Sequence, residues 1–301
     1  MQENNQQYLN RSVLFMPVSN QRAVAKATTL AVDTVIIDLE DSVADSAKQQ
    51  AVDLLGAALS QDFGKRRCLV RINAMSTPHW QNDIAALKHI VASGLNFDGI
   101  VLPKVESTEE IDTCVNAMDK AGIQSSLWIM VETSKGVQRV DELCAFGNPV
   151  TGIMIGTADL ALDLGLPDVR YLDPGSRSDF PRIGLIHSLS RVVLAARAAG
   201  IIVIDGVYPN FRDATGFERE ARQGLHLGFD GKSLIHPNQL DITHRVFTPS
   251  DEEVTEARAL VAAWGDANKA GLAVCSHNGV MVEELHVRQA QKRISLYEMS
   301  H

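Results

Sequence analysis

The sequence predicts an α/β protein, a (β/α)8 TIM barrel with a C-terminal helical extension. Eight short apolar runs rich in Val and Ile alternate with longer segments of helical period. The runs are apolar on both faces, which is typical of parallel strands that are covered on both sides, and eight such units fit a closed barrel. No GxGxxG pattern follows the first run, so the main dinucleotide-binding sequence of the competing open sheet is missing.

The apolar runs give the predicted strands, and the segments between them give the helices. The predicted strands are residues 12–18, 34–40, 68–73, 99–105, 127–132, 152–156, 201–207 and 231–236. Helical spacing of apolar residues predicts helices over 21–30, 47–59, 111–121 and 187–199. Thr108, Glu109 and Glu110 suit a helix start, while Gly122 and Gly200 stand where C-terminal caps are expected.

The alternation ends near Pro249, which predicts a barrel over residues 1–248 and an extension over 249–301. The segment SDEEVTEARALVAAWGDANKAG predicts a helix capped by Ser250, and a polar stretch after Cys275 leads into a second helix, VEELHVRQAQKRISLYEM. This extension either packs on its own barrel or reaches a neighbouring subunit.

Composition excludes several classes of function. The formal charge is −9, from 28 basic and 37 acidic residues, so we expect no nucleic-acid partner, because such a groove needs a net basic face. The four cysteines are far apart and form no CxxC pair, which predicts reduced thiols. No apolar run reaches the roughly 18 residues of a membrane span, and the polar start lacks a signal peptide. We therefore expect a cytoplasmic protein without a membrane partner.

Charged residues gather where the predicted strands end, which is the active-site end of a (β/α)8 barrel. Glu132 continues a buried strand, and such a carboxylate needs a cation or a metal as its partner. Together with Asp159 it predicts a site for a hard ion such as Mg²⁺, which accepts two protein ligands plus water and substrate. The alternative is that either carboxylate pairs with Arg71 or Lys104.

The remaining candidates each carry two interpretations. Asp41, beside Glu40, either adds charge around the metal or caps the next helix. Arg71 either stabilises an oxyanion or forms a structural ion pair. Arg22 and Lys26, four residues apart, either hold the phosphates of a cofactor or line an exposed helix face.

Seven motifs in order carry a family resemblance across nearly the whole chain. They are RSVLFMP, TVIIDLEDSVADSAKQQA, VRINA, IVLPKVES, IMVETSKGV, IGTADLALDLG and LIHPNQ. With these motifs in this order, the chain resembles the citrate lyase beta-subunit-like branch of the HpcH/HpaI aldolase superfamily. The resemblance implies a (β/α)8 fold, Mg²⁺, coenzyme A thioester substrates, and a homotrimer or hexamer in which the C-terminal segment covers a neighbour's site.

The resemblance also implies roles for single residues. Glu132 and Asp159 are expected to hold Mg²⁺, and Arg71 is expected to stabilise the reacting oxygens. The family's C-terminal signature, GxMVD or GxMID, ends on a proton-donating Asp, and here the corresponding position is Glu283. Glutamate keeps the acid but adds a methylene, and a displacement of about 1 Å can cost on the order of 100-fold in rate.

These expectations combine into one predicted function. The chain is expected to be a Mg²⁺-dependent carbon–carbon lyase that cleaves citramalyl-CoA or malyl-CoA into acetyl-CoA and a 2-oxo acid, with Glu283 returning the proton. A malyl-CoA thioesterase and an aldolase acting on free 2-oxo or hydroxy acids are alternatives within enzymes. A barrel that binds metal and CoA without turnover is the alternative from another class.

Overall fold

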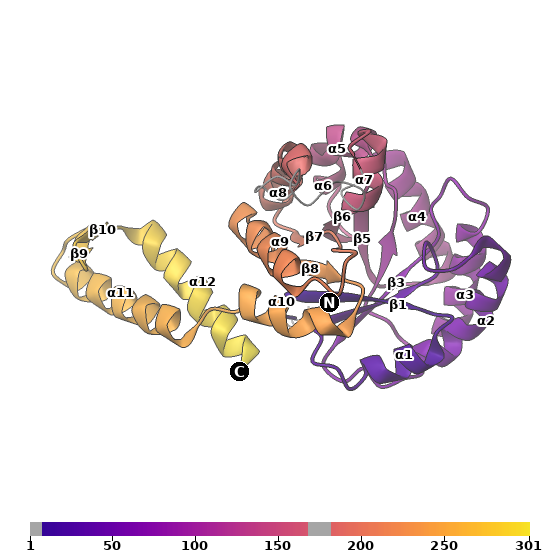
Figure 1. Ribbon diagram of the computed structural model, residues 1–301, viewed down its shortest axis with the longest axis horizontal. Coiled ribbons are helices and arrows are strands. Elements are labelled where there is room, and N and C mark those ends of the chain that lie inside the picture. Colours follow the sequence, from indigo (N-terminus) through magenta and orange to yellow (C-terminus); the bar gives the residue numbers. More distant parts are fainter. Residues whose placement is uncertain (1–7, 168–181) are drawn as a thin grey trace. The chain divides into compact units, whose positions relative to one another are not determined.

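The computed structural model describes residues 8–167 and 182–301 (Figure 1). The chain divides into two compact units, Met1–Thr243 and His244–His301, and each is described here by itself. No helix in the described ranges is both long enough and apolar enough to cross a membrane.

The first unit contains a closed barrel of eight parallel strands, as the sequence predicts. Each strand pairs with the next along the chain, and β8 pairs with β1. The strands are β1 (Ser12–Pro17), β2 (Thr34–Asp38), β3 (Arg67–Arg71), β4 (Gly99–Leu102), β5 (Ser126–Val131), β6 (Val150–Ile155), β7 (Ile202–Asp205) and β8 (Gly231–Leu234).

Helices and short 3-10 turns follow the strands and surround the barrel (Figure 1). In the described part of this unit the helices are α1 (Gln21–Ala27), α2 (Lys48–Leu59), α3 (Trp80–Ala92), α4 (Thr108–Ala121), α5 (Ser134–Gln138), α6 (Val140–Cys144), α7 (Thr157–Asp163), α8 (Ile186–Ala199) and α9 (Ala214–Leu227). Helix α10 (Leu240–Phe247) begins in this unit and ends in the next. The 3-10 turns are η1 (Asp45–Ala47), η4 (Ile183–Leu185) and η5 (Pro237–Gln239).

Local signals explain where single helices begin and end. Ser107 caps α4 by accepting a hydrogen bond from the backbone of Glu110, whose side chain accepts in turn from the Ser107 backbone. Gly122 and Gly200 end α4 and α8 in the left-handed conformation that glycine adopts without strain, as predicted. The predicted start of α4 at residue 111 is three residues late, because the Glu109-Glu110 pair belongs to the first helical turn.

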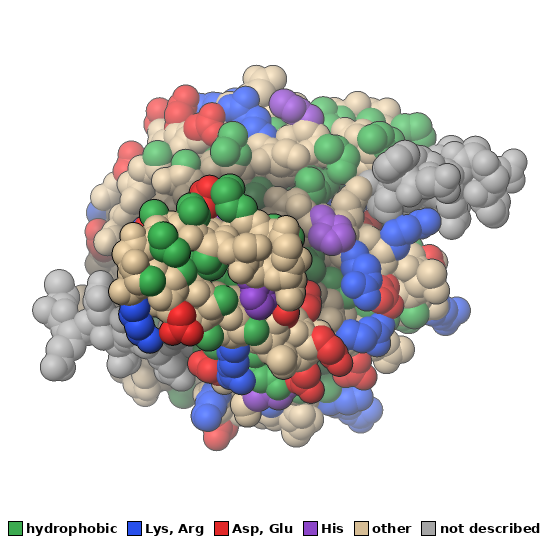
Figure 2. Space-filling view, turned by 90° about the vertical axis from the view of Figure 1, so that its left-hand side faces the viewer, with side chains coloured by type: hydrophobic (Ala, Val, Ile, Leu, Met, Phe, Trp, Pro, Cys, Tyr) green, Lys and Arg blue, Asp and Glu red, His purple; other side chains and the backbone are tan. Residues whose placement is uncertain are grey.

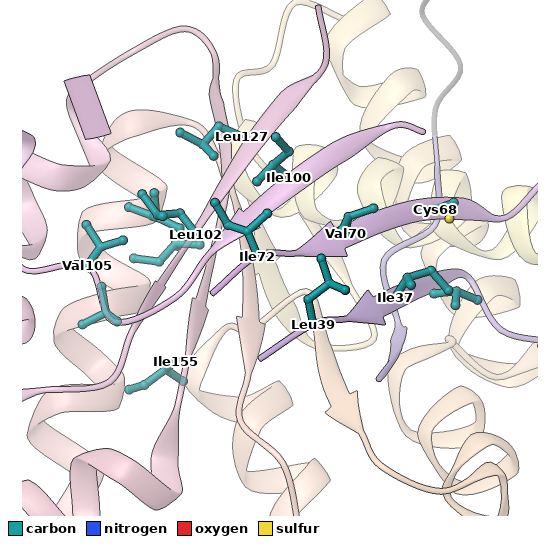
Figure 3. Close-up of a cluster of buried hydrophobic side chains, with 14 of the residues drawn as sticks. Ile37, Leu39, Cys68, Val70, Ile72, Ile100, Leu102, Val105, Leu127 and Ile155 are labelled. Atoms are coloured by element: carbon teal, nitrogen blue, oxygen red, sulfur yellow. The ribbon is translucent and has the colours of Figure 1, made fainter. Parts of the chain in front are cut away.

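Alternation along the strands separates two apolar layers, because successive side chains of a strand point to opposite faces. The side chains that fill the barrel are Val13, Phe15, Ile36, Leu69, Val101, Trp128, Met130, Met154 and Ile204. Their neighbours face the helices, as Ile37, Val70, Ile100 and Leu102 do in Figure 3. Residues that follow Ile36, Leu69 and Met130 at spacing two therefore point inward at the barrel mouth.

A fully paired group of charges lies on the outer side of the barrel, between β7, β8 and α9. The ammonium of Lys232 contacts Asp205 Oδ2 at 3.1 Å and Glu220 Oε1 at 2.9 Å, and donates to the carbonyl of Gly206. Arg182 Nη1 contacts Asp205 Oδ1 at 2.6 Å and Glu220 Oε1 at 3.7 Å. Lys232 and Asp205 are completely buried, and we name these four charged side chains the outer ion cluster.

The C-terminal unit consists of two helices and a hairpin. They are α11 (Asp251–Lys269), the antiparallel strands β9 (Cys275–His277) and β10 (Val280–Val282), and α12 (Glu284–Ser300). Ser250 caps α11, as predicted, with Glu253 completing the capping box. The hairpin was not predicted, because strands of three residues carry too little alternation, although Asn278-Gly279 is a common two-residue hairpin turn.

The hairpin and its flanks expose apolar side chains. Among the described residues of this unit the most exposed large ones are Leu272, Val274, Val280, Met281 and Leu285, each between 47% and 64% exposed. Hydrophobic side chains are visible on the face that Figure 2 shows. Exposed apolar side chains in such a group are typical of surfaces that contact another protein.

Candidate active site

Three carboxylates meet at the barrel mouth, where the carboxyl ends of β2, β5 and β6 lie. Asp41, Glu132 and Asp159 each offer one oxygen, and these oxygens all lie within 4.8 Å of one another. Asp41 is in the loop after β2, Glu132 directly follows β5, and Asp159 is in the first turn of α7. Three hard oxygen donors at this separation suit a cation such as Mg²⁺.

Glu132 is the buried member of this trio, with only 1% of its surface exposed. Its Oε1 accepts a hydrogen bond from the backbone N–H of Lys104 at 3.1 Å, whereas its Oε2 has no hydrogen-bond partner among the described residues. Burial, together with the negative charge of Glu40, raises the pKa of Glu132 to about 8. A buried carboxylate oxygen without a partner is the feature expected of a cation ligand.

Gly156 makes the space that Glu132 occupies. It lies between β6 and α7, and a Cβ at this position would meet the Glu132 carboxylate. The backbone of residue 156 and the side chain of residue 132 therefore fit together only because residue 156 is glycine. This close fit fixes the carboxylate beside the helix turn that carries Asp159.

We expect Gly156→Ala to push the Glu132 carboxylate out of this position. The apparent affinity for Mg²⁺, measured by titration calorimetry, should fall by roughly 10- to 100-fold, the usual range for loss of support around a metal ligand. Gly56→Ala is the matched control, because a Cβ at Gly56 in α2 meets nothing within 4 Å. An unchanged Mg²⁺ affinity in the Gly156 variant would contradict this assignment.

A fixed guanidinium stands beside the carboxylates. Asp38 Oδ1 and Oδ2 accept from Arg71 Nε and Nη2, each at 2.7 Å, and the Phe15 ring centroid is 4.6 Å from the guanidinium carbon. Burial alone would raise the pKa of Asp38, but the paired charge of Arg71 outweighs it and holds the pKa below its usual range. With two nitrogens held in this way, Arg71 Nη1 is directed at Glu40 and Asp41, at 3.1 Å and 3.5 Å.

Lys104 brings a second cation to the same group of charges. Its Nζ contacts Glu40 Oε1 at 2.6 Å and Asp41 Oδ1 at 3.0 Å, and its side chain is 31% exposed. Burial alone would lower the pKa of Lys104, but its contacts with Glu40 and Asp41 raise it. The amine therefore stays protonated at neutral pH, which does not suit the free amine that a Schiff base requires.

Comparison with known proteins decides the family. Residues 11–237 match the family model of the HpcH/HpaI aldolase/citrate lyase family. The chain belongs to this family. It is 38% identical over 289 residues to a (3S)-malyl-CoA thioesterase of Cereibacter sphaeroides, covering 96% of this chain and 94% of the relative.

Two further proteins extend the comparison. An L-malyl-CoA/beta-methylmalyl-CoA lyase of Cereibacter sphaeroides is 32% identical, with 96% of this chain and 95% of the relative covered. The crystal structure of the Mycobacterium tuberculosis protein CitE, in complex with magnesium, acetoacetate and coenzyme A, superimposes with a TM-score of 0.79 at 28% identity. That comparison covers 97% of this chain and 99% of CitE, which confirms the barrel fold predicted from the sequence.

Of the seven site residues predicted from the sequence, the structure brings four together, and the other three lie elsewhere. Asp41, Arg71, Glu132 and Asp159 meet at the barrel mouth. Arg22 and Lys26 lie exposed on α1, without an ion pair to any described residue. Glu283 belongs to the C-terminal unit, at the start of α12, where its backbone N–H donates to His286 Nδ1 at 3.0 Å. The roles of all seven remain predictions.

Two members of the site were not chosen from the sequence. Asp38 was not recognised as the partner of Arg71, although its spacing of two from the inward-facing Ile36 is a signal that would have found it. Lys104 was expected only as a possible ion-pair partner of the carboxylates, and its backbone bond to Glu132 depends on a left-handed conformation, φ 53°, that the sequence does not signal.

Proposed function

We propose that the chain is a Mg²⁺-dependent carbon–carbon lyase that cleaves a 3-hydroxyacyl-CoA, such as citramalyl-CoA or malyl-CoA, into acetyl-CoA and a 2-oxo acid. The observation that carries this proposal is the convergence of Asp41, Glu132 and Asp159 beside the fixed guanidinium of Arg71. The malyl-CoA lyase relative and the CitE complex with magnesium and coenzyme A support the same chemistry.

Glu132 and Asp159 would hold the ion, and Asp41 would add negative charge beside it. The unpartnered Glu132 Oε2 and the all-carboxylate donor set fit Mg²⁺. When bound, Mg²⁺ supplies a Lewis acid that polarises the substrate's carboxylate and adjacent hydroxyl oxygens. Because Glu132 is buried with a raised pKa, it has to lose a proton before it can serve as a ligand.

Arg71 would stabilise the charge that develops when the carbon–carbon bond breaks. The hydroxyl oxygen becomes the carbonyl of the 2-oxo acid, and the bonding electrons move onto the acetyl-CoA fragment as an enolate. Arg71 Nη1 is the nitrogen that Asp38 does not hold. It faces Glu40 and Asp41 at the barrel mouth, so it is the nitrogen that would donate to such an oxyanion. Asp38 has no acid–base role here and keeps the guanidinium oriented.

The hydroxyl proton leaves to solvent as the carbonyl of the 2-oxo acid forms. The reaction is completed when another proton reaches the enolate carbon and forms the new C–H bond of acetyl-CoA, so that overall no proton is gained or lost. We propose Glu283 as the proton donor, from the C-terminal unit of the same or a neighbouring subunit. The longer side chain of glutamate requires a backbone position that differs from one suited to aspartate.

Coenzyme A and the assembly belong to the same proposal. Arg22 and Lys26, exposed on α1 after the first strand, are proposed to contact the phosphates of CoA. The apolar side chains exposed around the hairpin support a homo-oligomer, which we propose to be a trimer or hexamer. A cytoplasmic location agrees with free thiols at Cys68, Cys114, Cys144 and Cys275.

A thioesterase is the second candidate, because a relative of that activity is 38% identical to the chain. In that reaction water attacks the thioester carbon and releases free CoA, while the carbon–carbon bond stays intact. An aldolase on free 2-oxo or hydroxy acids would need no CoA. A barrel without turnover would bind Mg²⁺ and CoA and release neither product.

Product analysis separates these functions. We expect the purified protein, given malyl-CoA and Mg²⁺, to form acetyl-CoA and glyoxylate in equal amounts, measured by liquid chromatography over time. Chelation with EDTA should stop the reaction, and excess Mg²⁺ should restore it. Asp159→Asn is the matched inactive variant. Free CoA with malate as the first products would establish a thioesterase, and absence of any product from malyl-CoA and citramalyl-CoA would refute turnover of these thioesters.

A further inference from the structure

The charges at the barrel mouth do not cancel. Five carboxyl groups, those of Asp38, Glu40, Asp41, Glu132 and Asp159, face two cations, Arg71 and Lys104. With all of them ionised, the described residues of the site carry three excess negative charges. A divalent ion reduces this excess to one, and an anionic substrate must still approach a negative surface.

Lys104 differs from Arg71 in how it is held. Arg71 is bound on two nitrogens by the buried Asp38, whereas Lys104 makes side-chain contacts only with Glu40 and Asp41 among the described residues. Its own backbone N–H donates to the ligand candidate Glu132. The left-handed φ of 53°, which non-glycine residues rarely adopt, directs this N–H to Glu132 and leaves the ammonium at the mouth.

Asp41 connects the ammonium to the ion. One of its oxygens lies within 4.8 Å of oxygens of Glu132 and Asp159, and its Oδ1 contacts Lys104 Nζ at 3.0 Å. The positive charge of the ammonium therefore makes the electrostatic potential less negative at the position that a cation would occupy.

We propose that Lys104 is a positioning residue whose positive charge weakens the binding of Mg²⁺ and strengthens the binding of the anionic substrate. This inference rests on the proposed function. A positive side chain at this point makes Mg²⁺ binding weaker than the carboxylates alone would give, and it offsets repulsion of the substrate carboxylate. Loss of the ammonium must then move the two affinities in opposite directions.

The test is Lys104→Met, which removes the ammonium and keeps the length of the side chain. Titration calorimetry at pH 9 with Mg²⁺ alone should show binding about tenfold tighter than in the parent protein. Removal of a positive charge beside the carboxylates strengthens their attraction for the doubly charged ion. With saturating Mg²⁺, the KM for malyl-CoA should rise about tenfold, with a smaller change in kcat.

Two further variants distinguish the effect of the ammonium charge from the effect of the backbone conformation at residue 104. Lys104→Gly also lacks the ammonium but adopts positive φ without strain, so it should match Lys104→Met in Mg²⁺ affinity. Lys104→Arg keeps the charge and should keep the parent Mg²⁺ affinity. Lys120→Met is the control for a general change of charge, because Lys120 is exposed in the last turn of α4, at the opposite end of the barrel from the site.

The outcomes are distinct. Tighter binding of Mg²⁺ together with weaker binding of malyl-CoA in both uncharged variants, Lys104→Met and Lys104→Gly, supports the inference. Parallel weakening of both ligands in these variants would show that Lys104 only maintains structure and would overturn it, while Mg²⁺ binding by the parent protein would leave the proposed function intact. A parent protein that binds no Mg²⁺ at pH 9 would overturn both.

Discussion

Glu132→Gln should abolish lyase turnover and at the same time stabilise the protein at high pH. The variant loses a negative ligand, so kcat/KM for malyl-CoA at fixed Mg²⁺ should fall about 1000-fold, equivalent to several kcal/mol of Lewis-acid stabilisation. In parallel, removal of an ionisable group from a buried position removes the cost of charging it.

The sign of the stability change follows from the pKa. Folding raises the pKa of Glu132 from 4.5 to about 8, so the folded state binds the proton more tightly than the unfolded chain does. Stability of the metal-free parent protein therefore falls as the pH rises from about 4.5 to about 8, by roughly 3 to 5 kcal/mol at 1.36 kcal/mol per pKa unit. Glu132→Gln lacks this loss.

Urea denaturation in EDTA at pH 5 and pH 9 measures the effect. The parent protein and Glu132→Gln should have similar free energies of unfolding at pH 5, and the variant should be the more stable at pH 9. Asp159→Asn provides the comparison, because Asp159 is only half-buried and should give a much smaller gain. Equal stabilities of parent and Glu132→Gln at pH 9 would mean that Glu132 is not desolvated.

Arg71→Met should have the second largest effect, because it removes a cation from between buried carboxylates. Asp38 would be left completely buried without its partner, which typically costs about 3 to 5 kcal/mol of folding free energy. The oxyanion donor is lost as well, so kcat should fall by about 100- to 1000-fold. Denaturant unfolding and initial rates with malyl-CoA measure the two losses separately.

The double variant Asp38→Asn/Arg71→Met distinguishes a structural ion pair from an oxyanion donor. With both partners neutral, no carboxylate of Asp38 remains buried and unpaired, and much of the lost stability should return. Activity should stay low, because the guanidinium is still missing. Recovery of kcat together with stability would show that Arg71 serves the fold alone.

Much of the barrel could be predicted from the sequence, because eight buried strands leave eight apolar runs. The predicted ends were less accurate, as the run 99–105 shows. It continues in apolar sequence to Val105, but β4 ends at Leu102, since Pro103 has no backbone N–H and Lys104 has positive φ. Val105 is buried in the outer apolar layer without belonging to the strand.

The site was predictable to the extent that strand ends carry charge. Position in the sequence identified Asp41, Arg71, Glu132 and Asp159, but not which cation pairs with which carboxylate. Arg71 pairs with Asp38 across neighbouring strands, in a register that only the closed sheet supplies. The cavity that Gly156 leaves for Glu132 depends on contact between β5 and β6, and one glycine among 21 carries no such signal in the sequence.

The outer ion cluster limits how this part of the barrel can change during evolution. The buried charges of the outer ion cluster neutralise one another, so neutralising any one of its side chains leaves a partner's charge buried and unpaired. A first mutation at one of these positions leaves a net charge in the cluster and lowers fitness before a second mutation can restore a net charge of zero. Natural variants of this layer should therefore exchange opposite charges together or replace a whole pair with apolar residues.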